Sequence, residues 1–265
     1  MNKKIGFIGA GNMAKAMMSG VISSKMVDPK NIIASDGYLP SLENIKKEFG
    51  VQVAQSNKEV VKFSDVIFLA VKPNIYGAIM EEIKDSLGDK IVVTIAPGKT
   101  LEYMENGLGT SAKILRTMPN TPALVGEGVT AICPNQNITQ DELEDLKAIL
   151  GTFGTVETID EHLFDVVVSV SGSSPAYVYM FIEAMADGAV QQGMSRPQAY
   201  KMAAQAVMGS AKMVLETGKH PGELKDMVCS PGGTTIDAVA VLEEQGFRSA
   251  VIKAMEAVCV KSAKM

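Results

Sequence analysis

The sequence predicts an α/β fold with a doubly wound, mostly parallel sheet, followed by an all-helical domain. Two observations predict this organisation. Up to about residue 160, short apolar runs rich in β-branched residues alternate with helical patterns, as expected for parallel strands connected by helices. Beyond that point, long stretches rich in alanine and methionine succeed one another. We therefore place one domain at residues 1–160 and a second at residues 161–265.

Six strands are expected in the first domain. The early ones are nearly continuous apolar runs, which indicates that helices cover both faces of the sheet. The expected strands are Lys4–Gly9, Asn31–Ser35, Val66–Val71, Ile91–Ile95, Lys113–Met118 and Val129–Cys133. In the second domain only Val166–Val170 resembles a strand, and its pattern is ambiguous.

Helices with clear patterns are expected between and after these strands. A spacing of four predicts one apolar stripe, formed by Ile75, Ile79, Ile83 and Leu87. Another helix is expected to begin at Thr139, because Glu142 follows three residues later, as in a capping box. Its inward-facing residues are expected to be Leu143, Leu146 and Leu150.

The second domain is expected to consist of helices that bury much of their surface. The stretch Ala199–Met213 carries few charges on any side, which predicts burial in a bundle or against a second subunit. The last helix has one apolar stripe, formed by Phe247, Val251, Ala254 and Val258. Many of the 17 methionines fall in this domain, and their default role is to fill gaps in a core.

Composition excludes several functional classes. The net charge is −5, and there is no tryptophan and no run of basic residues, so we expect no nucleic-acid partner. The three cysteines and two histidines show no ligand spacing, and we expect no metal. The apolar stretch from Val166 to Val190 is interrupted by Glu183 and Asp187, so we expect no membrane span. No targeting segment is apparent, and a cytoplasmic protein is expected.

A glycine-rich segment follows the first expected strand and opens a helix. It reads Gly9-Ala10-Gly11-Asn12-Met13-Ala14. In this pattern the first glycine permits a tight turn, and the second lets the backbone approach a pyrophosphate. A small third residue allows the helix to pack closely on the strand, and amides at the helix start receive the phosphates. The segment predicts a dinucleotide-binding Rossmann domain.

The end of the second expected strand bears on the choice of cofactor. Asp36 stands where an acidic side chain normally bonds to the adenosine ribose, which favours NAD over NADP. Equally, Asp36 could be a turn or cap residue, with Ser35 near the ribose. The sequence leaves both interpretations open.

Ligands of open α/β sheets bind at the carboxyl ends of the strands. Three further strand ends are therefore expected to line the cofactor crevice: Ala70-Val71-Lys72-Pro73, Ala96-Pro97-Gly98 and Met118-Pro119-Asn120. Lys72 is either a catalytic residue or a solvated lysine at a strand end.

A second glycine-rich loop lies far along the chain. Ser230-Pro231-Gly232-Gly233 stops one helix, and Thr234-Thr235 starts another. The amides at such a helix start can hold a small anion, for example a carboxylate. The alternative is a turn between two helices that has good caps and no ligand.

Together these segments resemble the pyrroline-5-carboxylate reductase family over essentially the whole chain. The matching segments are Phe7–Met13, Ala70–Pro73, Arg116–Pro122, Ser171–Tyr177 and Ser230–Thr235. The resemblance implies a helical domain that interlocks two subunits of a homodimer or larger homo-oligomer, with the active site where they meet. It also implies an oxidoreductase that reduces a small cyclic imine acid, 1-pyrroline-5-carboxylate, to L-proline in the last step of proline biosynthesis. NADP(H) is the implied cofactor, and Asp36 keeps NAD(H) as the alternative.

The motifs and the resemblance together give two sets of expected contacts. The cofactor-binding set is Ile8, Gly9, Ala10, Gly11, Asn12, Met13, Ser35, Asp36, Asn57, Ala70, Val71, Lys72, Pro73, Ala96, Gly98, Met118, Pro119 and Asn120. The substrate-binding set is Val228, Ser230, Gly232, Gly233, Thr234 and Thr235. Main-chain amides of Gly233 and Thr234 would hold the substrate carboxylate, and the catalytic Thr235 hydroxyl would point to the imine nitrogen. Some relatives have a glutamate near the substrate where this chain has Gly218, so no acid is assigned there.

Two other functions compete with this interpretation. A β-hydroxyacid dehydrogenase would share the two-domain plan, but it would have a catalytic lysine on the first helix after the sheet, and Val168–Ala176 contains none. A non-enzymatic dinucleotide sensor or scaffold would also keep the fold, because fold alone does not determine function. The presence of both intact glycine-rich loops argues against it.

Overall fold

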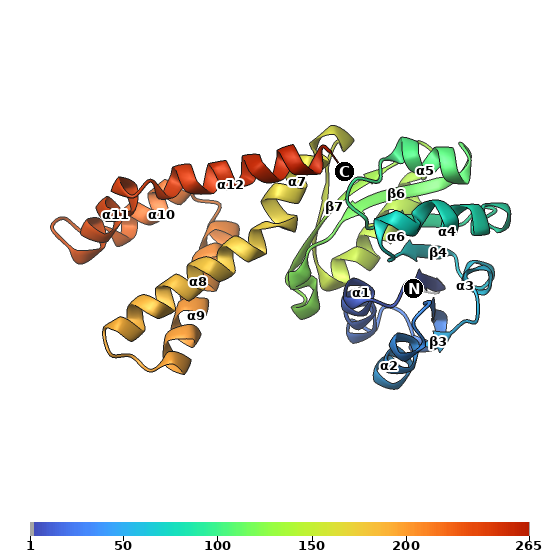
Figure 1. The fold of residues 1–265 in the computed structure, drawn as a ribbon, viewed down its shortest axis with the longest axis horizontal. Helices are drawn as coiled ribbons and strands as arrows, with labels where there is room; N and C mark the ends of the chain where they lie inside the picture. The colour runs from blue at the N-terminus through green and yellow to red at the C-terminus, as the bar shows by residue number, and fades with distance from the viewer. Residues whose placement is uncertain (1–2, 265) are drawn as a thin grey trace. The chain divides into compact units, whose positions relative to one another are not determined.

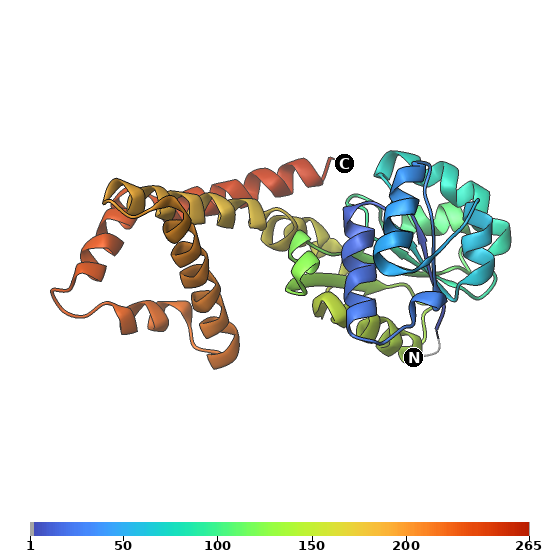
Figure 2. The same ribbon diagram turned by 90° about the horizontal axis from the view of Figure 1, so that it is seen from below.

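The computed structural model describes residues 3–264 and contains one eight-stranded sheet (Figures 1 and 2). The strands are β1 (Ile5–Ile8), β2 (Ile32–Ser35), β3 (Gln52–Val53), β4 (Val66–Leu69), β5 (Ile91–Thr94), β6 (Lys113–Met118), β7 (Gly128–Pro134) and β8 (Gly154–Thr158). Their order in the sheet is β3-β2-β1-β4-β5-β6-β7-β8. Every neighbouring pair is parallel except β6 and β7, which are antiparallel.

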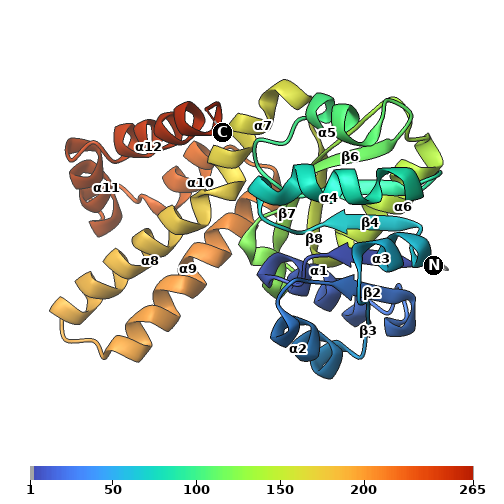
Figure 3. The same cartoon turned by 45° about the vertical axis from the view of Figure 1, so that its right-hand side comes forward.

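Helices cover both faces of this sheet, as the apolar strands predict. One core joins the sheet to α1 (Asn12–Ser23), α2 (Leu39–Phe49) and α6 (Gln140–Leu150). The other core joins it to α3 (Asn57–Phe63), α4 (Tyr76–Ile83) and α5 (Leu101–Leu108) (Figure 3). The phenyl rings of Phe7 and Phe68 stack between neighbouring strands at 5.0 Å. This arrangement confirms the Rossmann-type α/β fold.

The chain divides into two compact units. One holds the residues up to Ser173 together with the C-terminal segment from Val258, and the other is Ser174–Ala257. In the first unit, a short helix α7 (Phe164–Val167) runs into a π-helical turn, Val168–Gly172. The domain boundary at residue 160 stays a prediction.

The second unit is helical, as predicted. Its helices are α8 (Ser174–Gln191), α9 (Arg196–Thr217), α10 (Pro221–Val228), α11 (Thr234–Glu244) and the greater part of α12 (Phe247–Ser262). Helices α8 and α9 pack on each other, and the rings of Phe181 and Phe247 lie 6.0 Å apart. Within the described part of this unit the buried apolar side chains are Ala186, Ala199 and Ala203.

Several expectations from the sequence need correction. Strands β3 and β8 were not predicted; β3 has only two residues, and the side chains of β8 are mostly exposed, so neither shows an apolar run. The stretch Val166–Val170 is helical, not a strand. In α4 the buried side chains are Tyr76, Met80 and Ile83, whereas Ile75 is 42% exposed.

The helix predicted to begin at Thr139 is confirmed. The Thr139 side chain caps it, and Glu142 completes the capping box. Its buried side chains include the three predicted leucines. Over residues 3–264, none of the helices combines the length and apolar character needed to cross a bilayer.

Candidate functional site

The turn after β1 has a conformation that requires glycine. Gly9 has φ +105°, and a Cβ built on it would lie 2.4 Å from the carbonyl oxygen of Ala70. The Gly9 N–H donates to the Ser35 carbonyl at 2.8 Å. A side chain here would strain the backbone and push the ends of β1 and β4 apart. The turn that the sequence predicts therefore depends on this glycine.

The start of α1 fits the pyrophosphate of a dinucleotide. No side chain caps the helix, so its first-turn amides remain for a ligand. A Cβ built on Gly11 would meet no atom within 4 Å, which leaves this side of the loop open. Ala14 is buried, as expected for close packing of helix on sheet. Amides and the helix dipole together favour a bound anion here.

Asp36 is a structural part of this loop. One carboxylate oxygen accepts the Ala10 N–H at 2.7 Å, and the other accepts the Tyr38 N–H at 2.8 Å. Both oxygens are thus engaged with the backbone. The arrangement matches the interpretation of Asp36 as a turn residue, with Ser35 beside it.

Three side chains form a hydrogen-bonded chain that begins at Ser35. The Ser35 hydroxyl donates to Asn57 Oδ1 at 2.7 Å, and Asn57 Nδ2 donates to Glu82 Oε2 at 2.7 Å. Ser35 and Asn57 belong to the expected cofactor set. Glu82 was missed, because it lies on α4 with no motif or spacing to connect it with the strand ends.

Buried hydroxyl groups tie together the carboxyl ends of three strands. The Tyr76 hydroxyl donates to the Leu69 carbonyl at 2.5 Å and accepts from the Thr94 hydroxyl at 3.2 Å. The Thr117 hydroxyl donates to the Thr94 carbonyl at 2.9 Å. Burial raises the pKa of Tyr76 to about 12. The network fixes the strand ends that are followed by the expected cofactor segments.

Two of these segments follow the fixed ends of β4 and β5. After β4 come Ala70 and Val71, both half-buried, and the exposed Lys72. Lys72 forms no ion pair within the described residues. After β5, Ala96 is buried and Gly98 is half-buried. All of these residues lie at the edge of the sheet where the sequence predicts the crevice.

Asn120 is held at both ends of its amide. Its Nδ2 donates to the Ser171 carbonyl at 3.1 Å, and its Oδ1 accepts the Val129 N–H at 3.0 Å. The side chain is buried. Asn120 therefore fastens the segment after β6 to the π-helical turn. From the sequence, Asn120 was expected only as a contact of the cofactor.

A buried arginine that the sequence analysis did not single out as functional lies close to this edge. Arg116 pairs with Glu161 at 2.7 Å, and its guanidinium carbon lies 4.3 Å from the ring centre of Phe164. Glu161 also accepts the Leu101 N–H at the start of α5. A cavity of about 400 Å³ borders these residues and includes Gly98. Arg116 thus connects the sheet to the segment that leads into the helical half of the chain.

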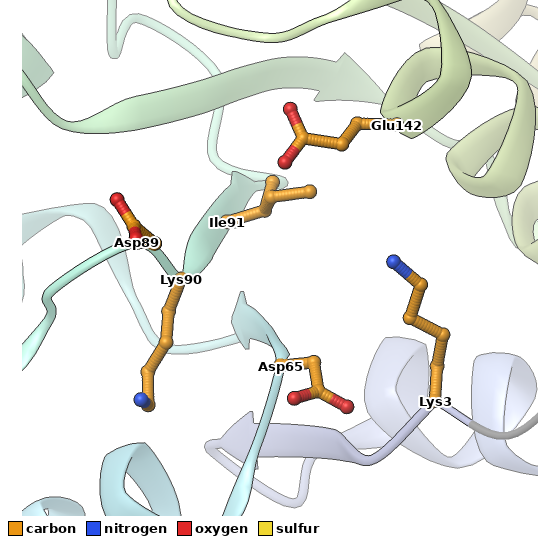
Figure 4. A pocket seen from close by; sticks show the side chains of 6 residues that line it. All are labelled: Lys3, Asp65, Asp89, Lys90, Ile91 and Glu142. Carbon is orange, nitrogen blue, oxygen red and sulfur yellow. The ribbon is translucent and has the colours of Figure 1, made fainter.

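A smaller cavity of about 250 Å³ lies at the opposite, amino-terminal edge of the sheet (Figure 4). Two of its charged side chains have ion-pair partners: Lys3 pairs with Asp145, and Glu142 pairs with Lys113. Burial acts to raise the pKa of Glu142, but hydrogen bonds from Lys113 and Thr139 outweigh it and hold the pKa below its usual value. Because ligands of such sheets bind at the carboxyl ends, this cavity is structural.

The second glycine-rich loop connects α10 to α11 (Figure 2). Gly232 has φ +68°, and a Cβ on Gly233 would lie 2.4 Å from the Ser230 hydroxyl oxygen. The Gly233 N–H donates to the Ser230 carbonyl at 3.0 Å. It is therefore already used within the turn, contrary to the expectation that it holds a carboxylate.

The amides that remain at this helix start belong to Thr234 and Thr235. No side chain caps α11, so its first turn keeps N–H groups for an anion. Thr235 is half-buried, and Thr234, Gly232, Ser230 and Val228 are exposed. Within residues 3–264 no three His, Cys, Asp or Glu side chains are arranged to hold a metal ion.

Comparisons with known proteins match two separate parts of the chain to two families. Residues 4–98 match the family described as NADP oxidoreductase coenzyme F420-dependent. Residues 161–265 match the family described as pyrroline-5-carboxylate reductase dimerisation. The pyrroline-5-carboxylate reductase of Escherichia coli (strain K12) is 56% identical over 269 residues, covering 100% of this chain and 99% of the relative. The chain belongs to the pyrroline-5-carboxylate reductase family.

Solved structures of pyrroline-5-carboxylate reductases share the fold. The enzyme from Coxiella burnetii has a TM-score of 0.93 and 34% identity, covering 100% of this chain and 98% of that one. The Plasmodium falciparum enzyme, solved with NADP bound, has a TM-score of 0.90 and 34% identity, covering 98% of this chain and 97% of that one. The family prediction is thereby confirmed. The match to a dimerisation domain indicates that the chain forms a homo-oligomer.

Proposed function

We propose that this pyrroline-5-carboxylate reductase binds its two ligands at the two glycine-rich helix starts, the cofactor at α1 and the substrate carboxylate at α11. The reaction is the reduction of 1-pyrroline-5-carboxylate to L-proline by hydride from NAD(P)H. The observation that carries the assignment is that neither helix start is capped by a side chain. Uncapped amides at a helix N-terminus bind anionic groups without any net positive charge nearby.

At the cofactor end, Gly9–Met13 would contact the pyrophosphate, with Ile8 ending the strand beneath. Ser35, Asp36 and Asn57 would lie on the adenosine side. Towards the nicotinamide the contacts would be Ala70, Val71, Lys72, Pro73, Ala96, Gly98, Met118 and Pro119. Asn120 would act by holding this last segment in place, since its amide is already bonded at both ends. The bound dinucleotide would supply the hydride.

At the substrate end, the amides of Thr234 and Thr235 would hold the carboxylate and orient the ring. Val228, Ser230, Gly232 and Gly233 would complete the pocket. The Thr235 hydroxyl would bond to the imine nitrogen. Once that nitrogen carries a proton, the neighbouring carbon accepts a hydride; the C=N double bond becomes a C–N single bond, and both hydrogens remain on the product.

The oligomer belongs to the same proposal. A homodimer or a larger homo-oligomer would bring together the Rossmann unit of one subunit and the helical unit of another, so that each active site draws on two chains. We place its activity in the cytoplasm, where the cofactor and the substrate are small soluble molecules.

The test is the substitution Thr235→Ala. We expect kcat/KM for 1-pyrroline-5-carboxylate to fall by roughly a hundredfold, because the hydroxyl contacts the reacting nitrogen. The dissociation constant of the cofactor should change by less than about twofold, because Thr235 lies in the substrate loop. Both are measured through the absorbance and fluorescence of the reduced nicotinamide.

The matched control is Thr217→Ala, which removes an exposed hydroxyl at the end of α9 and should leave both constants unchanged. If Thr235→Ala weakens cofactor binding as much as turnover, or leaves turnover intact, its assigned role is wrong. A parallel assay with a 3-oxo acid tests the dehydrogenase alternative.

A further inference from the structure

Glu82 is the end of the hydrogen-bonded chain that begins at Ser35. Its carboxylate accepts from Asn57 Nδ2 at 2.7 Å, and it forms no ion pair within residues 3–264. The neighbouring Glu81 differs, because Lys84 pairs with it at 2.8 Å. The adenosine side of the proposed cofactor site thus has a carboxylate whose charge no cation balances.

The orientation of the hydrogen bonds gives this end of the site an acceptor character. The Glu82 carboxylate accepts a hydrogen bond from the Asn57 amide nitrogen, so Asn57 Oδ1 faces Ser35. The Ser35 hydroxyl donates its hydrogen bond to Asn57 Oδ1, so only its oxygen lone pairs remain for a ligand. Asp36, the next residue, adds a second carboxylate, which the loop backbone holds in place.

We propose that Glu82 is a specificity-determining residue that acts through Asn57 to weaken binding of the 2′-phosphorylated dinucleotide relative to the unphosphorylated one. A ribose 2′-hydroxyl can donate to the lone pairs that this arrangement presents. A 2′-phosphate carries between one and two negative charges and needs donors instead. Repulsion between the Glu82 carboxylate and the 2′-phosphate therefore weakens the binding of NADP(H) and does not affect the binding of NAD(H).

This inference rests on the proposed placement of the adenosine ribose at Ser35 and Asn57. From the sequence, Asp36 was one candidate for deciding between the two cofactors, with a turn or cap role as the alternative. In the structure both oxygens of Asp36 hold the glycine loop, so a substitution there would disturb the turn itself. Glu82 is half-buried on the surface of α4, and its only side-chain hydrogen bond among the described residues is to Asn57. A glutamine, which has the same size, can replace it.

The decisive variant is Glu82→Gln, which removes the charge and keeps an oxygen that accepts from Asn57. Dissociation constants of NADP⁺ and NAD⁺ are measured by calorimetry for the full-length oligomer at low salt. We expect NADP⁺ to bind about fivefold more tightly than to wild type, the size expected for like charges in a partly exposed setting. NAD⁺ affinity should change by less than about twofold, and the gain should shrink at high salt.

The matched control is Glu81→Gln, which removes the same charge one residue away, where Lys84 balances it. It should leave the ratio of the two dissociation constants unchanged. An unchanged ratio in Glu82→Gln, or the same change in both variants, overturns the role of Glu82. So does an equal loss of affinity for both cofactors, which would make Glu82 a merely structural support of Asn57. Failure of the wild-type protein to bind either dinucleotide would instead contradict the proposed function.

Discussion

The two units of the chain differ in what they do with their apolar side chains. In the Rossmann unit, strands β1, β2, β4 and β5 are buried along their whole length. In the described part of the helical unit, only three alanines are buried among the apolar residues. Large side chains remain open there, for example Met180 at 69% and Leu215 at 81% exposure. Apolar side chains therefore make a closed core in one unit and an open surface in the other.

The difference indicates where the oligomer obtains its stability. Monomeric proteins rarely expose large contiguous apolar patches, and such patches mark interfaces. The helical unit lies within the region, residues 161–265, that matches a dimerisation domain. We therefore expect another copy of the chain to complete the core of the helical unit, whereas the Rossmann unit has two buried cores of its own.

The largest expected effect tests this contrast directly. Met180→Glu places a carboxylate on α8 of the helical unit, and we expect the subunit dissociation constant to rise by a hundredfold or more, because burial of an unpaired charge costs several kcal/mol. Sedimentation velocity across a concentration series measures it.

The control for this substitution is Leu39→Glu, in which an equally exposed side chain (66%) on α2 of the Rossmann unit is changed. It should leave the dissociation constant as it is. If both variants dissociate alike, or neither does, the helical unit is not the surface that depends on a partner.

An intermediate effect concerns the glycine loop of the Rossmann unit. Gly9→Ala should lower the free energy of unfolding by about 2 kcal/mol or more, because the positive φ and the Ala70 carbonyl both oppose a Cβ. Denaturant unfolding measures the loss, which should occur without a change in the subunit dissociation constant.

Gly11 supplies the matching comparison, since a Cβ there meets no atom within 4 Å. Gly11→Val should keep the stability of the wild type and still weaken cofactor binding, because the larger side chain enters the open space beside the proposed pyrophosphate. Unaltered affinity in Gly11→Val would refute the loop assignment. Unaltered stability in Gly9→Ala would refute the account of the turn.

The smallest effect depends on pH and tests the buried core of the Rossmann unit. Because the pKa of Tyr76 is raised to about 12, the unfolded chain loses this proton near pH 10 while the folded chain keeps it. The free energy of unfolding should therefore fall as pH rises from about 10 to 12, by about 2 kcal/mol. Tyr76→Phe should remove this part of the alkaline loss, at a cost of about 1 kcal/mol at pH 8.

Tyr38→Phe is the control for Tyr76→Phe, since Tyr38 is 66% exposed. Its free energy of unfolding should match that of the wild type at about pH 8 and at about pH 12. An alkaline loss that persists in full in Tyr76→Phe would show that other groups cause it.

The contrast between the units also explains which features the sequence could predict. Six strands and the capping box at Thr139 were predictable, because apolar runs and caps are local signals. Strand β8 was not, since its residues are mostly exposed and carry no apolar period. Val166–Val170 was ambiguous because β-branched residues favour strands, yet the chain there runs from α7 into a π-helical turn.

The proposed site shows the same limit. Glycine loops have a sequence signature because each glycine meets a local backbone demand. Glu82 and Arg116 have none, because their roles come from partners far along the chain, Asn57 and Glu161. The Gly233 amide was assigned to the substrate, but a turn hydrogen bond that no motif reveals occupies it. Family resemblance places residues in a pocket, and coordinates are needed to say which of their atoms remain available.

The end of the chain returns to the Rossmann unit, where the Ser262 hydroxyl donates to the Asp165 carboxylate at 2.6 Å and the Cys259 thiol donates to the Asp165 carbonyl. Ser262 and Asp165 are 97 residues apart in the sequence. At a synthesis rate of about 5–20 residues per second, Asp165 leaves the ribosome roughly 5–20 s before its partner. The helical unit is therefore an insertion within the sequence of the Rossmann unit. The segment from Val258 can join the Rossmann unit only after the helical unit has been synthesised.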